Sequence, residues 1–380
     1  MNKETRLDSL TSVRFVAALL VYLYHAEAHF RLGEAPAFQG LPATLTHLGF
    51  LGVPFFFQLS GFILTVVYAS RLGPGAEPGW RAGLRPYLVA RLARVYPLYL
   101  AGLVLSLPLV AFDARATAAT GLEVWLSLAL SPLLLQAWFP SVCLLWNAPG
   151  WSLSVEAAFY LAFPFLLRFF LRVRRSHLPG CYGLAILVAA LASGWITVWS
   201  PALGAPGPFA VPAPPLHHLS RYFPLLHLPA FLAGIIAGRW YLERPAPMTP
   251  RGRAATLAVL LGVPAGLLLG ADLVPHLHWH NWLMIPFFSL VILFLARQDP
   301  RIGWLRTRIP VLLGEASYAF YLLHIVVIRF YLKGLELVDG TRPSGLLHAT
   351  ICLFLGLGLS VLALVRVERP ARQWMVRVLR

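Results

Sequence analysis

Long apolar segments recur along this chain, and they restrict it to a membrane fold. Ten of them approach the roughly 20 residues that an α-helix needs to cross a bilayer. They cover residues 10–28, 50–69, 96–112, 151–171, 183–199, 222–241, 254–271, 280–297, 310–332 and 347–366. Charged residues make up only 12% of the chain, against about 25% in soluble domains. The sequence therefore predicts an all-α polytopic membrane protein with about ten transmembrane helices. We expect one membrane-embedded domain over residues 1–380, with no appended soluble domain.

A further apolar segment, residues 122–138, is interrupted by Pro132. Counting it as a crossing would place the basic residues 172–175 outside the membrane. We therefore expect an interfacial or re-entrant segment here rather than a span.

The basic residues sort by side of the membrane. The formal net charge of +16 is compatible with a nucleic acid partner. With the N-terminus in the cytoplasm, however, all but six of the 31 Lys and Arg residues fall on the cytoplasmic side. The six are Arg31, Arg115, Arg221, Arg329, Lys333 and Arg342. The positive-inside rule explains this distribution without a polyanion. We expect no nucleic acid partner and both termini in the cytoplasm.

Arg14 and His25 are the ionisable groups in the middle of the first apolar segment. They are close to three helical turns apart, so both side chains fall on nearly the same face, about 16 Å apart along the axis. Ionisable groups at membrane depth are costly and often mark a reaction or transport path. Alternatively, His25 makes a structural hydrogen bond between helices and Arg14 extends to the inner surface. Position alone favours neither interpretation.

Three more charged groups lie near segment ends. Arg91 and Arg94 share a helix face at the inner surface, where the third segment begins. Two guanidinium groups on one face suit a phosphate, although the pair taken alone is better explained as an ordinary positive-inside anchor. Glu156 enters the fourth segment and needs a partner there. Its alternative is a place at a helix N-terminus capped by Ser152 or Ser154.

Uncharged polar residues interrupt two other segments. Ser60 and Gly61 lie in the second, where small residues favour close helix packing or admit a flat acyl group. Tyr318, Tyr321 and His324 recur every three residues in the ninth, which puts them on one helix face. A second intramembrane histidine favours a functional cavity over a purely structural stripe.

The remaining histidines and cysteines give weak evidence for a metal. His276, His278 and His280 alternate in a short outer loop, and the three cysteines have no metal-type spacing. We expect no metal site.

Together these motifs resemble the acyltransferase 3 family of integral membrane acyltransferases, multi-span proteins that O-acylate glycans, lipids and secondary metabolites. The resemblance rests on the Arg-x10-His spacing, the Arg-x-x-Arg pair and the segments FFFQLSGF, WSLSVE and SYAFYLLH. It covers almost the whole chain, from RLDSLTSVRF to VERPARQW. The family's usual R-x-D-x-L-R-G start reads RLDSLTS here, with Thr11 and Ser12 in place of Arg-Gly.

The resemblance implies transfer of an acyl group, most often acetyl, from cytoplasmic acyl-CoA to a hydroxyl of a glycan, lipid-linked saccharide or metabolite in the bacterial inner membrane. It implies no tightly bound cofactor. His25 would take the proton from the acceptor hydroxyl or carry the acyl group briefly, and Glu156 would orient His25. Arg91 and Arg94 would hold the CoA phosphates, and Arg14 would guide the donor or stabilise its thioester oxygen. The other expected substrate-binding residues are Ser60, Gly61, Trp151, Ser152, Tyr318, Tyr321 and His324.

A transporter or flippase is the alternative function. In it, His25 and His324 would relay protons or bind substrate. Such a protein has no need of the Arg91–Arg94 pair or of Glu156, and the sequence shows no paired half-helices in corresponding halves. The sequence leaves the acceptor and the oligomeric state open.

Overall fold

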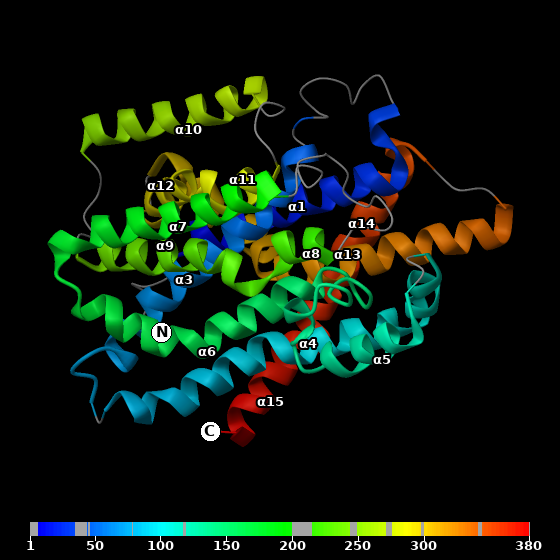
Figure 1. The fold of residues 1–380 in the computed structure, drawn as a ribbon, viewed down its shortest axis with the longest axis horizontal. Coiled ribbons are helices and arrows are strands. Elements are labelled where there is room, and N and C mark those ends of the chain that lie inside the picture. Colours follow the sequence, from blue (N-terminus) through cyan, green and yellow to red (C-terminus); the bar gives the residue numbers. More distant parts are fainter. Residues whose placement is uncertain are drawn as a thin grey trace.

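A computed structural model describes residues 7–34, 44, 46–77, 79–116, 119–199, 215–243, 249–270, 276–297, 300–340 and 344–379. Every regular element within these ranges is a helix, and most helices run along one common direction (Figure 1). Nine of the described helices are long and apolar enough to cross a membrane. The expected all-α polytopic membrane fold is confirmed.

The spanning helices follow the predicted segments closely. They are α1 (Asp8–Phe30), α3 (Gly52–Leu72), α4 (Trp80–Ala116), α6 (Gly150–Arg172), α7 (Leu178–Trp199), α9 (Pro224–Glu243), α12 (Ile285–Ala296), α13 (Arg308–Asp339) and α14 (Leu346–Ala363). The short turns η4 (Leu48–Leu51) and η9 (Trp279–Leu283) extend α3 and α12, respectively. The chain ends in η11 (Leu364–Glu368) and α15 (Arg369–Leu379).

The seventh predicted segment, residues 254–271, forms α10 (Pro250–Gly270), at the edge of the bundle beside α12 (Figure 1). It is not among the nine candidate spans. The described part of α9 ends at one end of the bundle, and η9 and α12 run back towards that end, so the chain has to return between them (Figure 1). In the described chain, α10 is the long helix between α9 and η9. Counting it as a crossing gives ten membrane helices, in agreement with the expected number of about ten.

The segment 122–138 does not span. It forms α5 (Gly121–Leu130), which has ten residues, followed by turns and the short helix η5 (Gln136–Trp138). The Gln136 amide donates hydrogen bonds to the Tyr99 hydroxyl at 2.9 Å and to the Gly150 carbonyl at 2.8 Å. This non-spanning segment therefore fastens the start of α6 to α4.

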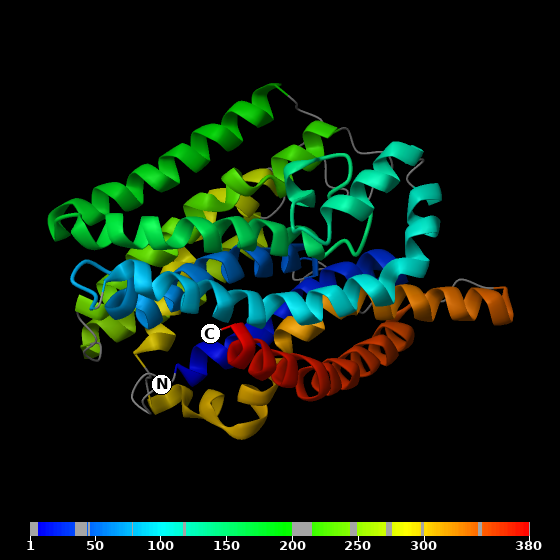
Figure 2. The same ribbon diagram turned by 90° about the horizontal axis from the view of Figure 1, so that it is seen from below.

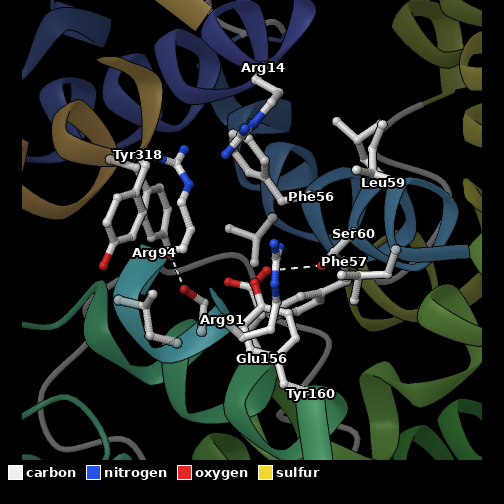
Figure 3. Close-up of a pocket in the computed structure, with 16 residues that line it drawn as sticks. Arg14, Phe56, Phe57, Leu59, Ser60, Arg91, Arg94, Glu156, Tyr160 and Tyr318 are labelled. Atoms are coloured by element: carbon white, nitrogen blue, oxygen red, sulfur yellow. Dashed lines mark hydrogen bonds between the residues drawn. The ribbon is translucent and has the colours of Figure 1, made fainter. Parts of the chain in front are cut away.

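Helix α4 differs from its predicted bounds. It begins at Trp80 rather than near residue 96 and continues through three prolines to Ala116. Arg91 and Arg94 consequently lie inside a continuous helix, not at the start of a span as expected. Their side chains project into the bundle (Figure 3).

One end of the bundle collects the basic residues. Helices α4 and α13 begin there, and α3, α6 and α9 end there (Figures 1 and 2). Arg168 on α6 donates to the Gly73 carbonyl after α3 at 3.3 Å, and Arg239 on α9 donates to the Val173 carbonyl after α6 at 2.6 Å. The cytoplasmic location of this basic end stays a prediction. Arg342 and the side chain of Arg115 lie outside the described residues.

Close helix contacts set the packing around the site. A Cβ on Gly61 would lie 2.3 Å from the Phe231 carbonyl oxygen, so α3 and α9 touch through backbone at this point. Gly314 on α13 meets the Thr11 carbonyl of α1 in the same way, at 2.0 Å. The Ser12 hydroxyl donates to the Leu305 carbonyl at 2.5 Å. The unusual Thr11–Ser12 start of α1 is thus packed against α13 and the turn before it.

Candidate active site

A cavity of about 130 Å³ lies between α1, α3, α4, α6 and α13 (Figure 3). We call it the arginine cavity, because three arginines from two helices line it. Its polar lining consists of Arg14, Ser60, Arg91, Arg94, Ser152, Glu156, Tyr160, Tyr318 and Tyr321. Eight of these were expected from the sequence; Tyr160, one turn beyond Glu156, was not. The bundle therefore brings residues that are far apart in sequence to one cavity.

Glu156 is the carboxylate in the wall of this cavity. The Ser60 hydroxyl donates a hydrogen bond to its Oε1 at 3.0 Å (Figure 3). Helix α6 begins six residues earlier, after Pro149, with no side-chain cap. Ser152 and Ser154 instead donate to the carbonyls of Pro149 and Leu134. The helix-capping alternative for Glu156 is therefore wrong.

Arg91 and Arg94 already have protein partners. Arg91 donates to the Tyr68 hydroxyl at 3.2 Å, and its guanidinium lies 5.4 Å from the centre of that ring. Arg94 forms an ion pair with Glu368 in η11, which is only 2% exposed. Sequence reasoning missed Glu368, although it stands in the family-like VERP segment, because no local pattern indicates its partner. The pair that we expected to hold phosphate is thus partly neutralised by the protein.

A second cavity, of about 60 Å³, lies beside the first. We call it the histidine cavity, because His25 and His280 line it. Aromatic rings contribute to the rest of its wall, from Tyr24, Phe50, Trp151, Tyr222 and Tyr321. Val53 and Tyr321 line both cavities. The two spaces are therefore neighbours that share a wall.

His25 and His324 face each other. His324 Nε2 lies 3.0 Å from His25 Nδ1, and the ring centroids are 5.0 Å apart. His324 Nδ1 lies 2.6 Å from the Tyr321 carbonyl oxygen, which can only accept, so this nitrogen carries the proton and Nε2 accepts. His25 Nδ1–H then donates to His324 Nε2 and to the Val21 carbonyl, 2.9 Å away. This network assigns the lone pair of His25 to Nε2.

Glu156 does not take the place that we expected for it beside His25. The two residues line different cavities, and His324 makes the histidine contact instead. Tyr321 stands between them, donating to the Ser152 hydroxyl at 2.8 Å. The reason is the packing of α13, which places its polar residue Tyr321 between Glu156 and His25.

The other expected residues divide between the cavities and the packing. Trp151 lines the histidine cavity. Among the described lining residues of either cavity, Gly61 and His324 are absent. Gly61 serves the α3–α9 contact, and His324, 1% exposed, lies behind His25. Arg221 and His280 were not expected in the site and line the histidine cavity.

The described residues contain no group of three His, Cys, Asp or Glu side chains that could hold a metal ion. His280 contacts Asn281 at 3.1 Å, and His278 accepts from the Trp282 indole at 3.0 Å. The His276 side chain lies outside the described residues. Cys143 is buried in the connection before α6, where burial raises the pKa of its thiol and disfavours a thiolate nucleophile.

Residues 7–365 match the family model of the acyltransferase domain. The chain belongs to the acyltransferase 3 family and is a membrane acyltransferase.

It is 31% identical to acyltransferase MdmB of Streptomyces mycarofaciens, over 86% of this chain and 80% of the relative. It is 25% identical to the exopolysaccharide production protein ExoZ of Rhizobium meliloti, over 85% and 89% of the two chains. The putative acetyltransferase ORF330 of Acidianus two-tailed virus is also 25% identical, over 84% and 82%. No solved structure matches this chain. Family membership favours the enzyme over the transporter.

Proposed function

We propose that this enzyme transfers an acyl group, most simply acetyl, from cytoplasmic acyl-CoA to a hydroxyl of a glycan or related acceptor in the bacterial inner membrane. The observation that carries the proposal is the pair of adjoining cavities, one cationic and one with a histidine base in an aromatic wall. The printed name of one relative, an exopolysaccharide production protein, supports a glycan acceptor.

The donor enters from the basic end of the bundle. Arg91 and Arg94 attract its anionic groups, with Tyr68 and Glu368 holding the two guanidinium groups in place. Arg14 and His25 are about 16 Å apart along α1. Arg14 therefore guides the donor rather than stabilising an oxyanion at the carbon that reacts near His25. The long flexible arm of the donor carries the thioester from one cavity towards the other.

Transfer then occurs at the wall that the two cavities share. The acceptor oxygen attacks the thioester carbon, forming a C–O bond as the C–S bond breaks. His25 Nε2 takes the proton of the hydroxyl and passes it to the departing CoA thiolate. His324 accepts from His25 Nδ1–H throughout and stabilises the imidazolium that forms.

The test uses purified protein and radiolabelled acetyl-CoA, added to membranes of a strain from which the gene has been deleted. Wild type should release CoA and label a polysaccharide or lipid-linked saccharide fraction. His25→Ala should lower labelling by about 10² to 10⁴-fold. Labelling at the wild-type rate by a folded His25→Ala variant would contradict the proposal. Isolation of an acetylated His25 would assign His25 as the nucleophile instead of the base.

A further inference from the structure

The histidine cavity contains a buried cation for which the described residues provide no counterion. Arg221, on α8 (Pro215–Tyr222), lines this cavity and is only 5% exposed. Its Nη2 atom is buried and has no hydrogen-bond partner in the described structure. The described lining contains no aspartate or glutamate. An uncompensated buried charge is strongly destabilising, so a bound anion would stabilise this part of the protein.

A buried histidine holds the backbone of Arg221 in place. Its backbone carbonyl accepts a hydrogen bond from His227 Nε2 at 2.9 Å. The His227 ring is 1% exposed and packs 5.3 Å from the Trp151 ring and 5.0 Å from the His280 ring. The backbone that carries the guanidinium is thus fixed by packed rings, and two of these, Trp151 and His280, also line the cavity.

The rest of the wall suits the flat apolar faces of a sugar ring. Trp151 and Tyr222 pack with ring centroids 4.8 Å apart, and Tyr24 and Phe50 lie 5.9 Å apart. All four line the cavity. Aromatic walls with a few placed polar groups are typical of small-molecule sites. His25 belongs to the same wall, so one ligand can contact both the base and the cation.

Resting on the proposed function, we infer that the histidine cavity is the acceptor site and that the acceptor is an anionic saccharide. Its carboxylate or phosphate pairs with Arg221, its ring packs on the aromatic wall, and one of its hydroxyls faces His25. Pairing with Arg221 selects the acceptor and sets which hydroxyl reaches the base. Arg221 takes no part in donor binding, because it lines only the histidine cavity.

Binding is measured first, without acetyl-CoA, so that the result does not depend on catalysis. Purified protein in phosphatidylcholine nanodiscs is dialysed to equilibrium against labelled methyl glucuronide, glucose-6-phosphate and methyl glucoside. A charge-assisted hydrogen bond predicts that wild type binds an anionic sugar about tenfold to a hundredfold more tightly than methyl glucoside. Comparing the glucuronide with the phosphate identifies which anion the site prefers.

The variants then assign the preference to Arg221. Arg221→Gln should abolish the preference for the anionic sugar, and Arg221→Lys should keep part of it. Arg31→Gln is the matched control, because Arg31 is exposed at 64% and its ion pair among the described residues is with the exposed Glu34.

Three results would overturn the inference: equal affinity of wild type for charged and neutral sugars, no binding of any of them at millimolar concentrations, or an equal loss for all in Arg221→Gln. Displacement of bound glucuronide by added phosphatidylglycerol would show that the anion site takes a lipid headgroup, and would also overturn it. Selective, Arg221-dependent binding by a protein that never transfers acetyl from acetyl-CoA would instead count against the proposed function alone.

Discussion

His25 gains its orientation from a residue 299 positions away in the chain. From its own helix, the Val21 carbonyl accepts from His25 Nδ1–H, which also donates to His324 Nε2. The Tyr321 carbonyl in turn determines the tautomer of His324. A neutral histidine acts as a base through the nitrogen that carries no proton, so this chain of contacts decides which atom reacts.

His324 is therefore expected to act as a positioning residue. His324→Ala should lower kcat by about tenfold to a hundredfold, less than His25→Ala, with the KM for acetyl-CoA unchanged. His324→Gln places an acceptor oxygen near the position of Nε2 and should retain more activity than His324→Asn, whose amide is too short. The measurement is steady-state kinetics on purified His25→Ala and on the Ala, Gln and Asn variants of His324. Equal kcat in the Gln and Asn variants would rule out the orienting hydrogen bond.

At the scale of the element, the donor side depends on α4 and the C-terminal end of α14 being joined through one buried ion pair. Arg94 lies at mid-length in α4, and Glu368 closes the π-helical turn η11 that follows α14. The ring of Tyr318 lies 5.6 Å from the Arg94 guanidinium, so α13 joins the same contact. Breaking a buried ion pair from one side costs about 3–5 kcal/mol, whereas an apolar pair of similar size restores much of that loss.

Glu368→Ala should therefore lower the thermal stability of the detergent-purified protein, and Arg94→Met with Glu368→Leu should recover most of it. The double variant nevertheless loses a cation of the arginine cavity, so its KM for acetyl-CoA should rise by about tenfold or more. Scanning fluorimetry and CoA-release kinetics measure the two effects separately. A stable double variant with the wild-type KM would remove Arg94 from the donor site.

Helix contact through glycine gives a second prediction at this scale. Gly61→Ala forces a methyl group against the Phe231 carbonyl and should destabilise the protein by about 1–3 kcal/mol through separation of α3 and α9. Gly194→Ala on α7 is the matched control, since an added Cβ there meets nothing within 4 Å. Their melting temperatures should differ clearly. Indistinguishable values would mean that the α3–α9 contact tolerates a methyl group.

For the whole molecule, the arrangement of helices predicts a definite topology. The basic end, where α4 and α13 begin, should face the cytoplasm. If α10 crosses the membrane, Glu243 and Gly270 lie on opposite sides. Alkaline phosphatase fused after Gly270 should then be active, and after Glu243 inactive. A fusion after Trp199, at the far end of α7, is the positive control. Matching activity for the Glu243 and Gly270 fusions would show that α10 does not cross.

Sequence alone was sufficient for properties that repeat locally. The length of apolar segments reports the thickness of the bilayer, so the membrane fold and the bounds of most spans were predictable. The helical repeat also placed Arg14 and His25 along one helix, and Arg91 and Arg94 on one face. Together with the other family-like motifs, these residues identified the class of enzyme without knowledge of any tertiary contact.

Tertiary structure decided which groups meet. The partner of His25 is His324 rather than Glu156, Arg94 is paired with Glu368, and Gly61 serves packing instead of the cavity. Arg221, read from sequence as an ordinary outer cation, lines the same cavity as His25. Each of these depends on the rotation and depth at which one helix packs on another. Side-chain interdigitation between distant segments sets that geometry, and no repeat within a single segment encodes it.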